Sequence, residues 1–123
     1  MEHKGLAIRN LLQLYPAMRF ILIGDTSQHD PEIYRHIVGE FPERVLAIYI
    51  RDVNRTPERK ASVAKLAAEV LEAGSTLVLG DDTMAAARHA AERGWIDVDS
   101  LELVQEEKRA DEGRNDAKIP ALP

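Results

Sequence analysis

The stretch GDTSQHDPEIY, residues 24–34, places two carboxylates five positions apart between an apolar run and an amphipathic run. Asp25 directly follows the apolar run, and Asp30 directly precedes Pro31. Ligands of open parallel sheets gather at the carboxyl ends of strands, so the Asp25 side chain is expected to project from such an edge. Two acids in one loop can reach the same hard cation. Mg²⁺ in particular takes one or two carboxylates and completes its shell with water and substrate phosphate.

The same loop also has an explanation that needs no ligand. A carboxylate at Asp30 followed by Pro31 is typical of a helix N-cap, and Glu32 in the first turn favours the helix dipole. Asp25 falls in a Gly-Asp-Thr-Ser segment, which is a good turn sequence. The spacing of the two acids therefore leaves a structural and a metal-binding interpretation open.

Further polar residues follow the other apolar runs. Arg51 comes directly after residues 45–50, where it is either a phosphate or carboxylate clamp or a surface partner of Asp52. The loop histidine His29 is a candidate substrate contact, although a single loop histidine usually has no such role. Lys4 precedes a helical pattern and, by its position alone, is an ordinary solvated lysine.

The elements that must position these residues are visible in the apolar pattern. Three short runs, residues 20–24, 45–50 and 76–80, are apolar on both alternating faces, which is typical of parallel strands covered on both sides. Helical periodicity precedes, separates and follows them. The order helix, strand, helix, strand, helix, strand, helix predicts βαβ units and a three-layer α/β/α sandwich with a parallel sheet. The helical patterns are Ile8–Leu11–Leu12–Tyr15, Ile33/Tyr34–Ile37–Val38–Phe41, Val63–Leu66–Ala67–Val70 and residues 83–94.

Composition limits the classes of protein that remain. The 123 residues are 45% hydrophobic, which suits one domain, predicted over residues 1–97 and followed by a polar, disordered tail over 98–123. The absence of cysteine excludes disulfides and thiolate chemistry. A net charge of −5 disfavours nucleic acid as a partner. No signal-peptide pattern or membrane-spanning run is present, so a cytoplasmic protein is expected.

Several separate motifs resemble one known family. The segments His3–Lys4, Tyr15–Pro16, 20–34 and 44–53, followed by 77–96, are similar to the second half of the actin-patch-type phosphatidate phosphatase catalytic domain. That family belongs to the haloacid dehalogenase (HAD) superfamily. The resemblance covers about residues 3–97 and implies a Rossmann-like, HAD-like sandwich.

The resemblance also implies roles for individual residues. HAD phosphatases carry four motifs, and Gly24–Asp25 with Asp30 matches the fourth, a Gly-Asp followed by a second aspartate, whereas Lys4 matches the third, a lysine. It implies that Asp25 binds Mg²⁺ directly and that Asp30 binds it directly or through water. Lys4 would neutralise the nucleophile and a phosphate oxygen. The expected substrate contacts are Arg51, Thr26 and His29.

One departure from the family limits what this chain can do alone. The first motif, Asp-x-Asp-x-Thr, does not occur, and Asp81–Thr83 has a different spacing. The resemblance thus implies that the nucleophile, its acid/base partner and the phosphate-binding Ser or Thr lie upstream of Met1. Without a nucleophile no phospho-aspartyl intermediate forms, so the chain alone should be inactive and its sheet should lack the nucleophile-bearing strand.

Two hypotheses of different classes follow. In the first, the chain is the C-terminal part of a Mg²⁺-dependent phosphatase acting on a phospholipid or a phosphorylated small molecule. Its bare strand edge would pair with the missing N-terminal half or with another copy. In the second, it is a non-catalytic α/β binding or interaction module derived from that fold. The substitution Asp25→Asn separates them, because only the first hypothesis needs that carboxylate.

Overall fold

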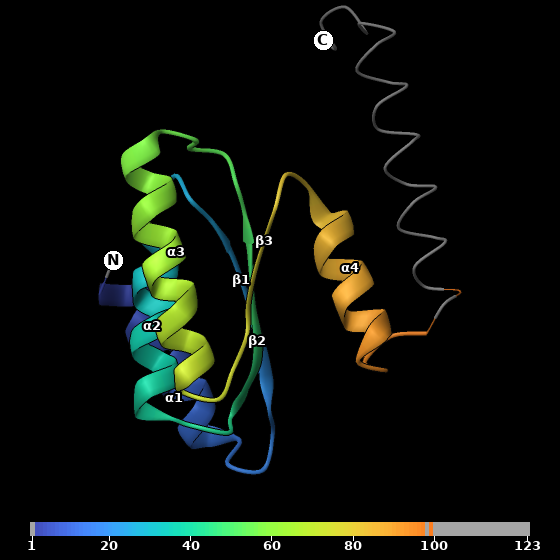
Figure 1. Ribbon diagram of the computed structural model, residues 1–123. Coiled ribbons are helices and arrows are strands. Elements are labelled where there is room, and N and C mark those ends of the chain that lie inside the picture. Colours follow the sequence, from blue (N-terminus) through green and yellow to red (C-terminus); the bar gives the residue numbers. More distant parts are fainter. Residues whose placement is uncertain (1, 98, 100–123) are drawn as a thin grey trace, which may run out of the picture. The chain divides into compact units, whose positions relative to one another are not determined.

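The computed structural model describes residues 2–97 and residue 99, and it contains the predicted alternation of helices and strands (Figure 1). The α/β class and the parallel sheet are confirmed. The chain divides into two compact units between Asp82 and Thr83. Apart from residue 99, the predicted tail over residues 98–123 lies outside the described residues. The elements are α1 (Glu2–Leu14), β1 (Phe20–Asp25), α2 (Asp30–Glu40), β2 (Val45–Arg51), α3 (Pro57–Glu72), β3 (Leu77–Gly80) and α4 (Thr83–Glu92), the last of which belongs to the second unit.

The sheet of the first unit has the order β1-β2-β3, and both pairings are parallel. The register places Asp25 opposite Arg51, and Arg51 opposite Gly80. The carboxyl ends of all three strands therefore meet at one edge of the sheet. Strand β2 is central, and its residues up to Ile50 are buried or partly buried because it has a neighbour on each side.

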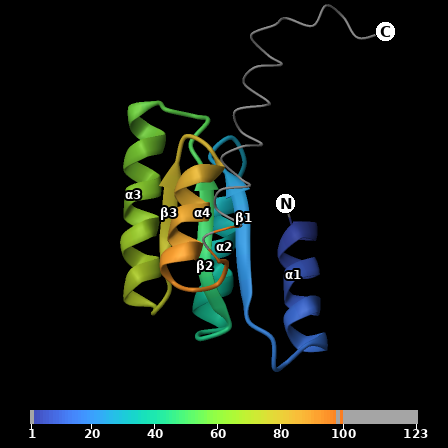
Figure 2. The same ribbon diagram turned by 90° about the vertical axis from the view of Figure 1, so that its right-hand side faces the viewer.

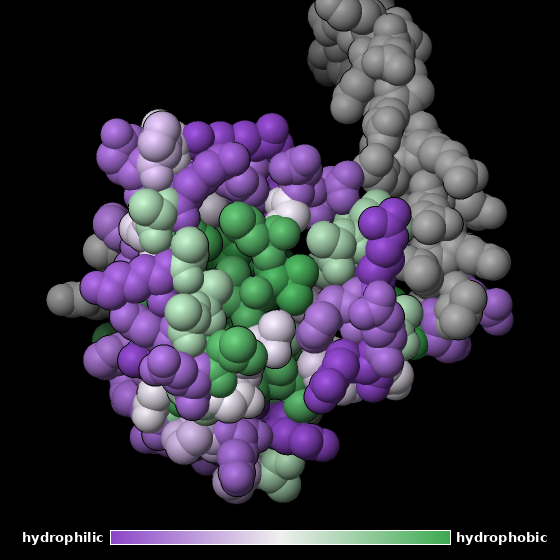
Figure 3. All heavy atoms as spheres, viewed as in Figure 1, coloured by the Kyte–Doolittle hydropathy of each residue, from purple (hydrophilic) through white to green (hydrophobic). Residues whose placement is uncertain are grey.

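Helices α2 and α3 lie on one face of this sheet (Figures 1 and 2). Helix α2 packs against β1 and β2, whereas α3 packs against β3 and against α2. Apolar side chains from both layers form the core, whose burial provides the main favourable free energy of folding. The outer surfaces of these helices are hydrophilic, and hydrophobic residues gather toward the strands (Figure 3). The core consists of Leu12, Leu22, Tyr34, Ile37, Val38, Val45, Ile48, Ile50 and Val70.

Helix α1 packs beside α2 and lies beyond β1, on the side away from β2 (Figure 2). Leu12 anchors it in the core. Its C-terminal end is held by the Arg44 guanidinium, which donates to the carbonyl oxygens of Leu12, Tyr15 and Met18. This attachment brings the N-terminal end of α1, with Lys4, to the edge where the strands end.

Within the part of the chain that the structure describes, no helix has the length and apolar character required to cross a bilayer.

Candidate functional site

The two loop carboxylates lie together at the carboxyl end of β1. Asp25 is the last residue of that strand, and Asp30 is the first residue of α2. The Asp25 backbone N–H donates to Asp30 Oδ2 at 3.2 Å. The Asp25 side chain turns toward the loop, where its Oδ1 accepts hydrogen bonds from the Ser27 N–H at 2.8 Å and the Ser27 hydroxyl at 2.5 Å. The loop thus folds back on itself and brings both carboxylates to one edge.

Gly24 makes this close approach sterically feasible. A Cβ atom at position 24 would lie 2.4 Å from Asp30 Oδ2, 2.5 Å from its Cβ and 2.7 Å from its Cγ. Each distance is well below van der Waals contact. The Asp30 side chain therefore occupies the space in which any other residue would place its first side-chain carbon, which gives the Gly-Asp pair a physical reason.

Lys4 reaches the Asp30 carboxylate from helix α1. Its ammonium donates to Asp30 Oδ1 at 2.6 Å, across 26 positions of sequence. The Asp30 side chain is 6% exposed, whereas the Lys4 side chain is 44% exposed and therefore remains accessible. The hydrogen bond to Asp30 is the main reason that the pKa of Lys4 is raised, and the charges of Asp30 and Asp25 add to it. The structure thus unites the three residues that the family resemblance selects.

The prediction that Asp30 caps α2 is wrong. The helix has His29 in the N-cap position, with no side-chain cap hydrogen bond, and Asp30 is its first residue. The Asp30 carboxylate accepts from Lys4 and from the Asp25 N–H instead of from its own helix. The bond to Lys4 joins two opposite charges, and Lys4 comes within reach of Asp30 only in the folded chain.

Tyr34 lies beneath the carboxylates, and the sequence pattern identified it only as a helix core residue. It is one turn after Asp30 on α2, and its buried hydroxyl donates to the Ile23 carbonyl at 2.6 Å. Burial is the main cause of its raised pKa, and the negative charges of Asp30 and Asp25 contribute. The i, i+4 spacing from Asp30 was the available signal, since such residues share a helix face. The phenol fixes the end of β1 against α2.

Arg51 is brought beside Asp25 by the pairing of β1 with β2. The two residues are opposite one another in the register, and Arg51 is exposed. The pKa of Asp25 is lowered, first by the hydrogen bond from the Ser27 hydroxyl and also by the positive charge of Arg51. Arg51 thus presents a cation at the site edge, as a phosphate clamp requires.

Thr26 holds the loop in place. It is buried, and its Oγ1 accepts from the backbone N–H groups of Val53 at 2.8 Å and Asn54 at 2.7 Å. These bonds join the loop after β1 to the loop after β2. Its predicted role as a substrate contact stays a prediction, and in this structure its hydroxyl is engaged with the protein.

His29 is exposed and lines a groove between α1 and α2, with a volume of about 620 Å³. The groove begins next to the site, because its lining includes the residue after Lys4 and the residue before Asp30. A contact between His29 and substrate is compatible with this place. The lining residues are Gly5, Leu6, Arg9, His29, Glu32, Ile33 and His36.

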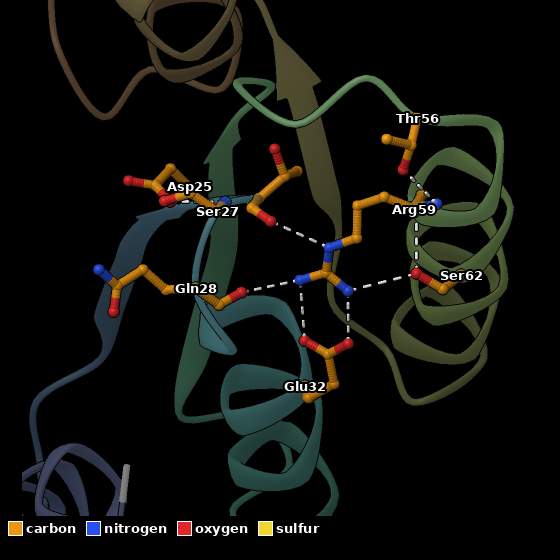
Figure 4. Close-up of polar contacts among 8 residues, drawn as sticks. Asp25, Ser27, Gln28, Glu32, Thr56, Arg59 and Ser62 are labelled. Carbon is orange, nitrogen blue, oxygen red and sulfur yellow. Dashed lines mark hydrogen bonds and ion pairs between the residues drawn. The ribbon is translucent and has the colours of Figure 1, made fainter.

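Arg59 of α3 binds the backbone of the loop that follows β1 (Figure 4). Its guanidinium donates to the carbonyl oxygens of Thr26 at 3.0 Å and Gln28 at 2.8 Å. It also binds the Glu32 carboxylate through two nitrogens, at 2.5 and 3.0 Å, and the Ser62 hydroxyl at 3.2 Å. The sequence offered no local signal for this contact, since Arg59 stands in the mixed run RTPERK. Its partners Thr26, Gln28 and Glu32 lie 33, 31 and 27 positions away in the sequence.

The Glu32–Arg59 pair also makes stability depend on pH. The hydrogen bond from Arg59 is the main reason that the pKa of Glu32 lies below its ordinary value of 4.5. A carboxylate of this kind stabilises the fold fully above 4.5, and the stabilisation is lost as pH falls below 4.5 through the lower folded-state pKa.

The substitution Glu32→Gln is therefore expected to flatten the loss of stability between about pH 6 and about pH 3. The effect should be modest, because the Glu32 side chain is 41% exposed and solvent screens the pair. Urea denaturation midpoints at both pH values measure it. Glu58→Gln, at an exposed position in the first turn of α3, controls for the removal of one acid. If Glu32→Gln lost as much stability between these two pH values as the natural protein, the Glu32–Arg59 pair would not be the cause of this pH dependence.

The side chains at the loop offer oxygen ligands of the type that Mg²⁺ binds. Asp25 and Asp30 provide carboxylate oxygens, which are the ligands that Mg²⁺ prefers, and two carboxylates with waters and a phosphate complete its shell. Among residues 2–97 and 99, no group of three or more His, Asp or Glu side chains is arranged to hold a metal ion. Asp25 and Asp30 thus have the ligand chemistry of Mg²⁺, and a bound ion would need water and phosphate for its remaining positions.

Comparison with known proteins gives an independent result for the first part of the chain. Residues 1–52 match the sequence model of the family described as "Phosphatidate phosphatase APP1, catalytic domain". A 44-residue stretch is 48% identical to phosphatidate phosphatase APP1 of Saccharomyces cerevisiae, covering 36% of this chain and 8% of the yeast protein. A 35-residue stretch is 49% identical to an uncharacterised protein of Schizosaccharomyces pombe, covering 28% of this chain and 6% of that protein.

These matches cover only part of this chain and a small part of each relative. The chain spans less than a tenth of the length of either curated relative. No solved structure matches the chain. The family match nevertheless includes Lys4, Gly24, Asp25, Asp30 and Arg51. Over residues 1–52 the chain is similar to the catalytic domain of phosphatidate phosphatase APP1, which confirms the resemblance for this part of the chain. The resemblance of residues 77–96 lies outside the match and stays a prediction.

Proposed function

We propose that this chain forms the C-terminal part of a Mg²⁺-dependent, HAD-type phosphatase that hydrolyses a phosphate monoester, either phosphatidate or a phosphorylated small molecule. The observation that carries the proposal is the Lys4–Asp30–Asp25 cluster, held at the carboxyl end of β1. It lies within the stretch similar to a phosphatidate phosphatase catalytic domain. Phosphatidate as substrate rests only on the names of the matched family and of the yeast relative.

The role of each residue would follow from the sign of its charge. Asp25 and Asp30 would hold the metal ion, which when bound supplies positive charge that offsets the repulsion between an attacking carboxylate and a phosphate dianion. The Lys4 ammonium, kept protonated by its raised pKa, would stabilise negative charge on a phosphate oxygen. Arg51, exposed beside Asp25, would orient the phosphate.

The attacking aspartate would come from a strand outside this sequence. Helix α1 leads directly into β1 and lies beyond it, away from β2 (Figure 2). A crossover helix packs over the two parallel strands that it connects. In the described part of the chain β1 is the first strand of the sheet, with β2 on one side only. The position of α1 thus supports a further parallel strand along the other edge of β1. In the proposed HAD-like fold, this strand bears the nucleophile at its carboxyl end, next to Asp25.

The test uses the longest natural form of the protein that contains these residues. Phosphate release from phosphatidate in detergent micelles and from a soluble aryl phosphate is measured with Mg²⁺ and with a chelator. Mg²⁺-dependent release that is lost in Asp25→Asn, with the fold retained, is the expected result. The matched control is Asp81→Asn, because Asp81 also follows a strand but its side chain is 75% exposed and pairs with Arg55. Absence of Mg²⁺-dependent phosphate release from both substrates in the natural protein would overturn the proposal in favour of a non-catalytic binding module.

A further inference from the structure

We infer that Arg59 is a positioning residue for the Asp25–Asp30 loop, setting the distance between the two carboxylates from a helix outside the family match. The match ends at residue 52, and Arg59 lies in the first turn of α3. The inference rests on the proposed metal site. It adds to that proposal a residue that never touches the metal.

The guanidinium uses its full hydrogen-bonding capacity on this loop and its surroundings. Arginine has five N–H donors in a fixed planar fork. The structure gives Arg59 five side-chain hydrogen bonds, to Thr26 O, Gln28 O, Ser62 Oγ and both Glu32 oxygens. The side chain is 14% exposed. A side chain so completely satisfied has one well-defined position, and so have the groups that it binds.

The contacts enclose the loop from both ends. Thr26 directly follows Asp25, whereas Glu32 comes two residues after Asp30. Arg59 thus binds the chain just after the first carboxylate and just after the second (Figure 4). Since both attachments meet at one rigid planar group, the loop between them cannot open without breaking several of these bonds. The separation of the carboxylates is thereby fixed before any metal binds.

Arg59 is itself anchored. The Thr56 side chain caps α3 and accepts from the Arg59 N–H at 3.2 Å, which fixes the backbone from which the guanidinium extends. Ser62 lies one turn further along α3 and also donates to the Arg59 carbonyl at 3.0 Å. The Arg59 contacts therefore hold the loop from a regular element, in addition to the bonds that Thr26 makes with the loop after β2. Sites supported in this way keep their geometry more accurately.

A fixed separation matters for the ion concerned. Mg²⁺ demands near-ideal octahedral geometry, so a loop that must be ordered upon binding would weaken its affinity. Groups that orient metal ligands without touching the metal typically contribute between about tenfold and about a hundredfold to metal affinity. Lysine cannot replace Arg59, because its single ammonium cannot bridge two carbonyl oxygens and a carboxylate.

The chain offers a matched control in Arg35. Its guanidinium donates to Glu69 at 3.0 Å, and this pair also joins α2 to α3. Both of its side chains are about one-third exposed, and neither touches the loop. Arg35→Lys therefore perturbs an α2–α3 arginine–glutamate pair without disturbing the carboxylate loop. Comparing Arg59→Lys with Arg35→Lys separates loop positioning from general attachment of the helices.

The experiment is a Mg²⁺ titration of the natural protein and the two variants, followed by backbone NMR, together with amide hydrogen exchange without metal. The expected result for Arg59→Lys is about a tenfold weaker Mg²⁺ affinity. Exchange at the Ser27 amide, which reports the Asp25 contact, should accelerate. Arg35→Lys should keep the natural affinity and exchange rate.

Either of two results would overturn the inference: unchanged exchange and affinity in Arg59→Lys, or equal effects in both variants. Failure of the proposed function gives a different pattern. If Mg²⁺ causes no NMR shifts in the natural protein, or only shifts that persist in Asp25→Asn, the proposed metal site is wrong. The exchange comparison still decides whether Arg59 orders the loop.

Discussion

Replacing Gly24 with alanine is expected to destabilise the protein by about 3 kcal/mol and to abolish Mg²⁺ binding at the loop. The new methyl group would lie 2.4–2.7 Å from three side-chain atoms of Asp30. Rotation of the carboxylate cannot relieve the clash, because the Asp30 Cβ is itself 2.5 Å away. The N-terminus of α2 must therefore move away from β1. That movement breaks the bond from the Asp25 N–H and the ion pair with Lys4.

Gly5→Ala is the matched control for this substitution. At position 5 the nearest atoms to an added Cβ are the tip of the flexible Arg9 side chain at 3.1 Å and an Ile33 methyl at 3.8 Å. Gly5 is inside helix α1, where alanine has the better intrinsic propensity by about 1 kcal/mol. We therefore expect a neutral or slightly stabilising effect there. Urea unfolding at neutral pH, with a Mg²⁺ titration by NMR, measures both variants. Equal stability of Gly24→Ala and the natural protein would contradict the geometry described here.

The second large effect is expected for Asp30→Asn, which should lose about 2 kcal/mol of stability together with Mg²⁺ binding. The carboxylate offers one oxygen to the Lys4 ammonium and the other to the Asp25 N–H. An amide has one oxygen and one NH₂ group, so it must turn a donor toward one of these two donors. Because the Asp30 side chain is only 6% exposed, water cannot readily replace the lost acceptor.

Asp81→Asn is again the appropriate control, since its carboxylate is 75% exposed and its ion pair with Arg55 should contribute less than about 1 kcal/mol. Lys4 provides an internal readout, because the hydrogen bond to Asp30 is the main cause of its raised pKa. NMR titration of the Lys4 ammonium should therefore show that pKa falling toward its ordinary value in Asp30→Asn. A Lys4 pKa that stays raised would mean that another group holds the ammonium.

Most of the elements could be predicted from the sequence, as could the position of Asp25 at the end of a strand. The runs at residues 20–24, 45–50 and 76–80 indicated strands that the structure gives as Phe20–Asp25, Val45–Arg51 and Leu77–Gly80. Buried parallel strands have an apolar pattern that is local in sequence, so their detection needs no knowledge of distant partners. The Gly24–Asp25 pair was recognisable for the same reason: both its turn chemistry and its motif are contained within a few residues.

Only the tertiary structure decided which partner each polar side chain takes. Asp30 was predicted to cap its own helix, which is its best local option, but folding brings Lys4 from 26 positions away to 2.6 Å. Arg59, in a mixed charged run, becomes the group that holds the loop through the Thr26 and Gln28 carbonyl oxygens. Sequence pattern determines which segments become helix or strand, because backbone conformation and amphipathicity are local properties. Partners of long charged side chains depend on distances that exist only after the helices have packed on the sheet. The contacts of Lys4 with Asp30 and of Arg59 with the loop are therefore properties of the tertiary structure.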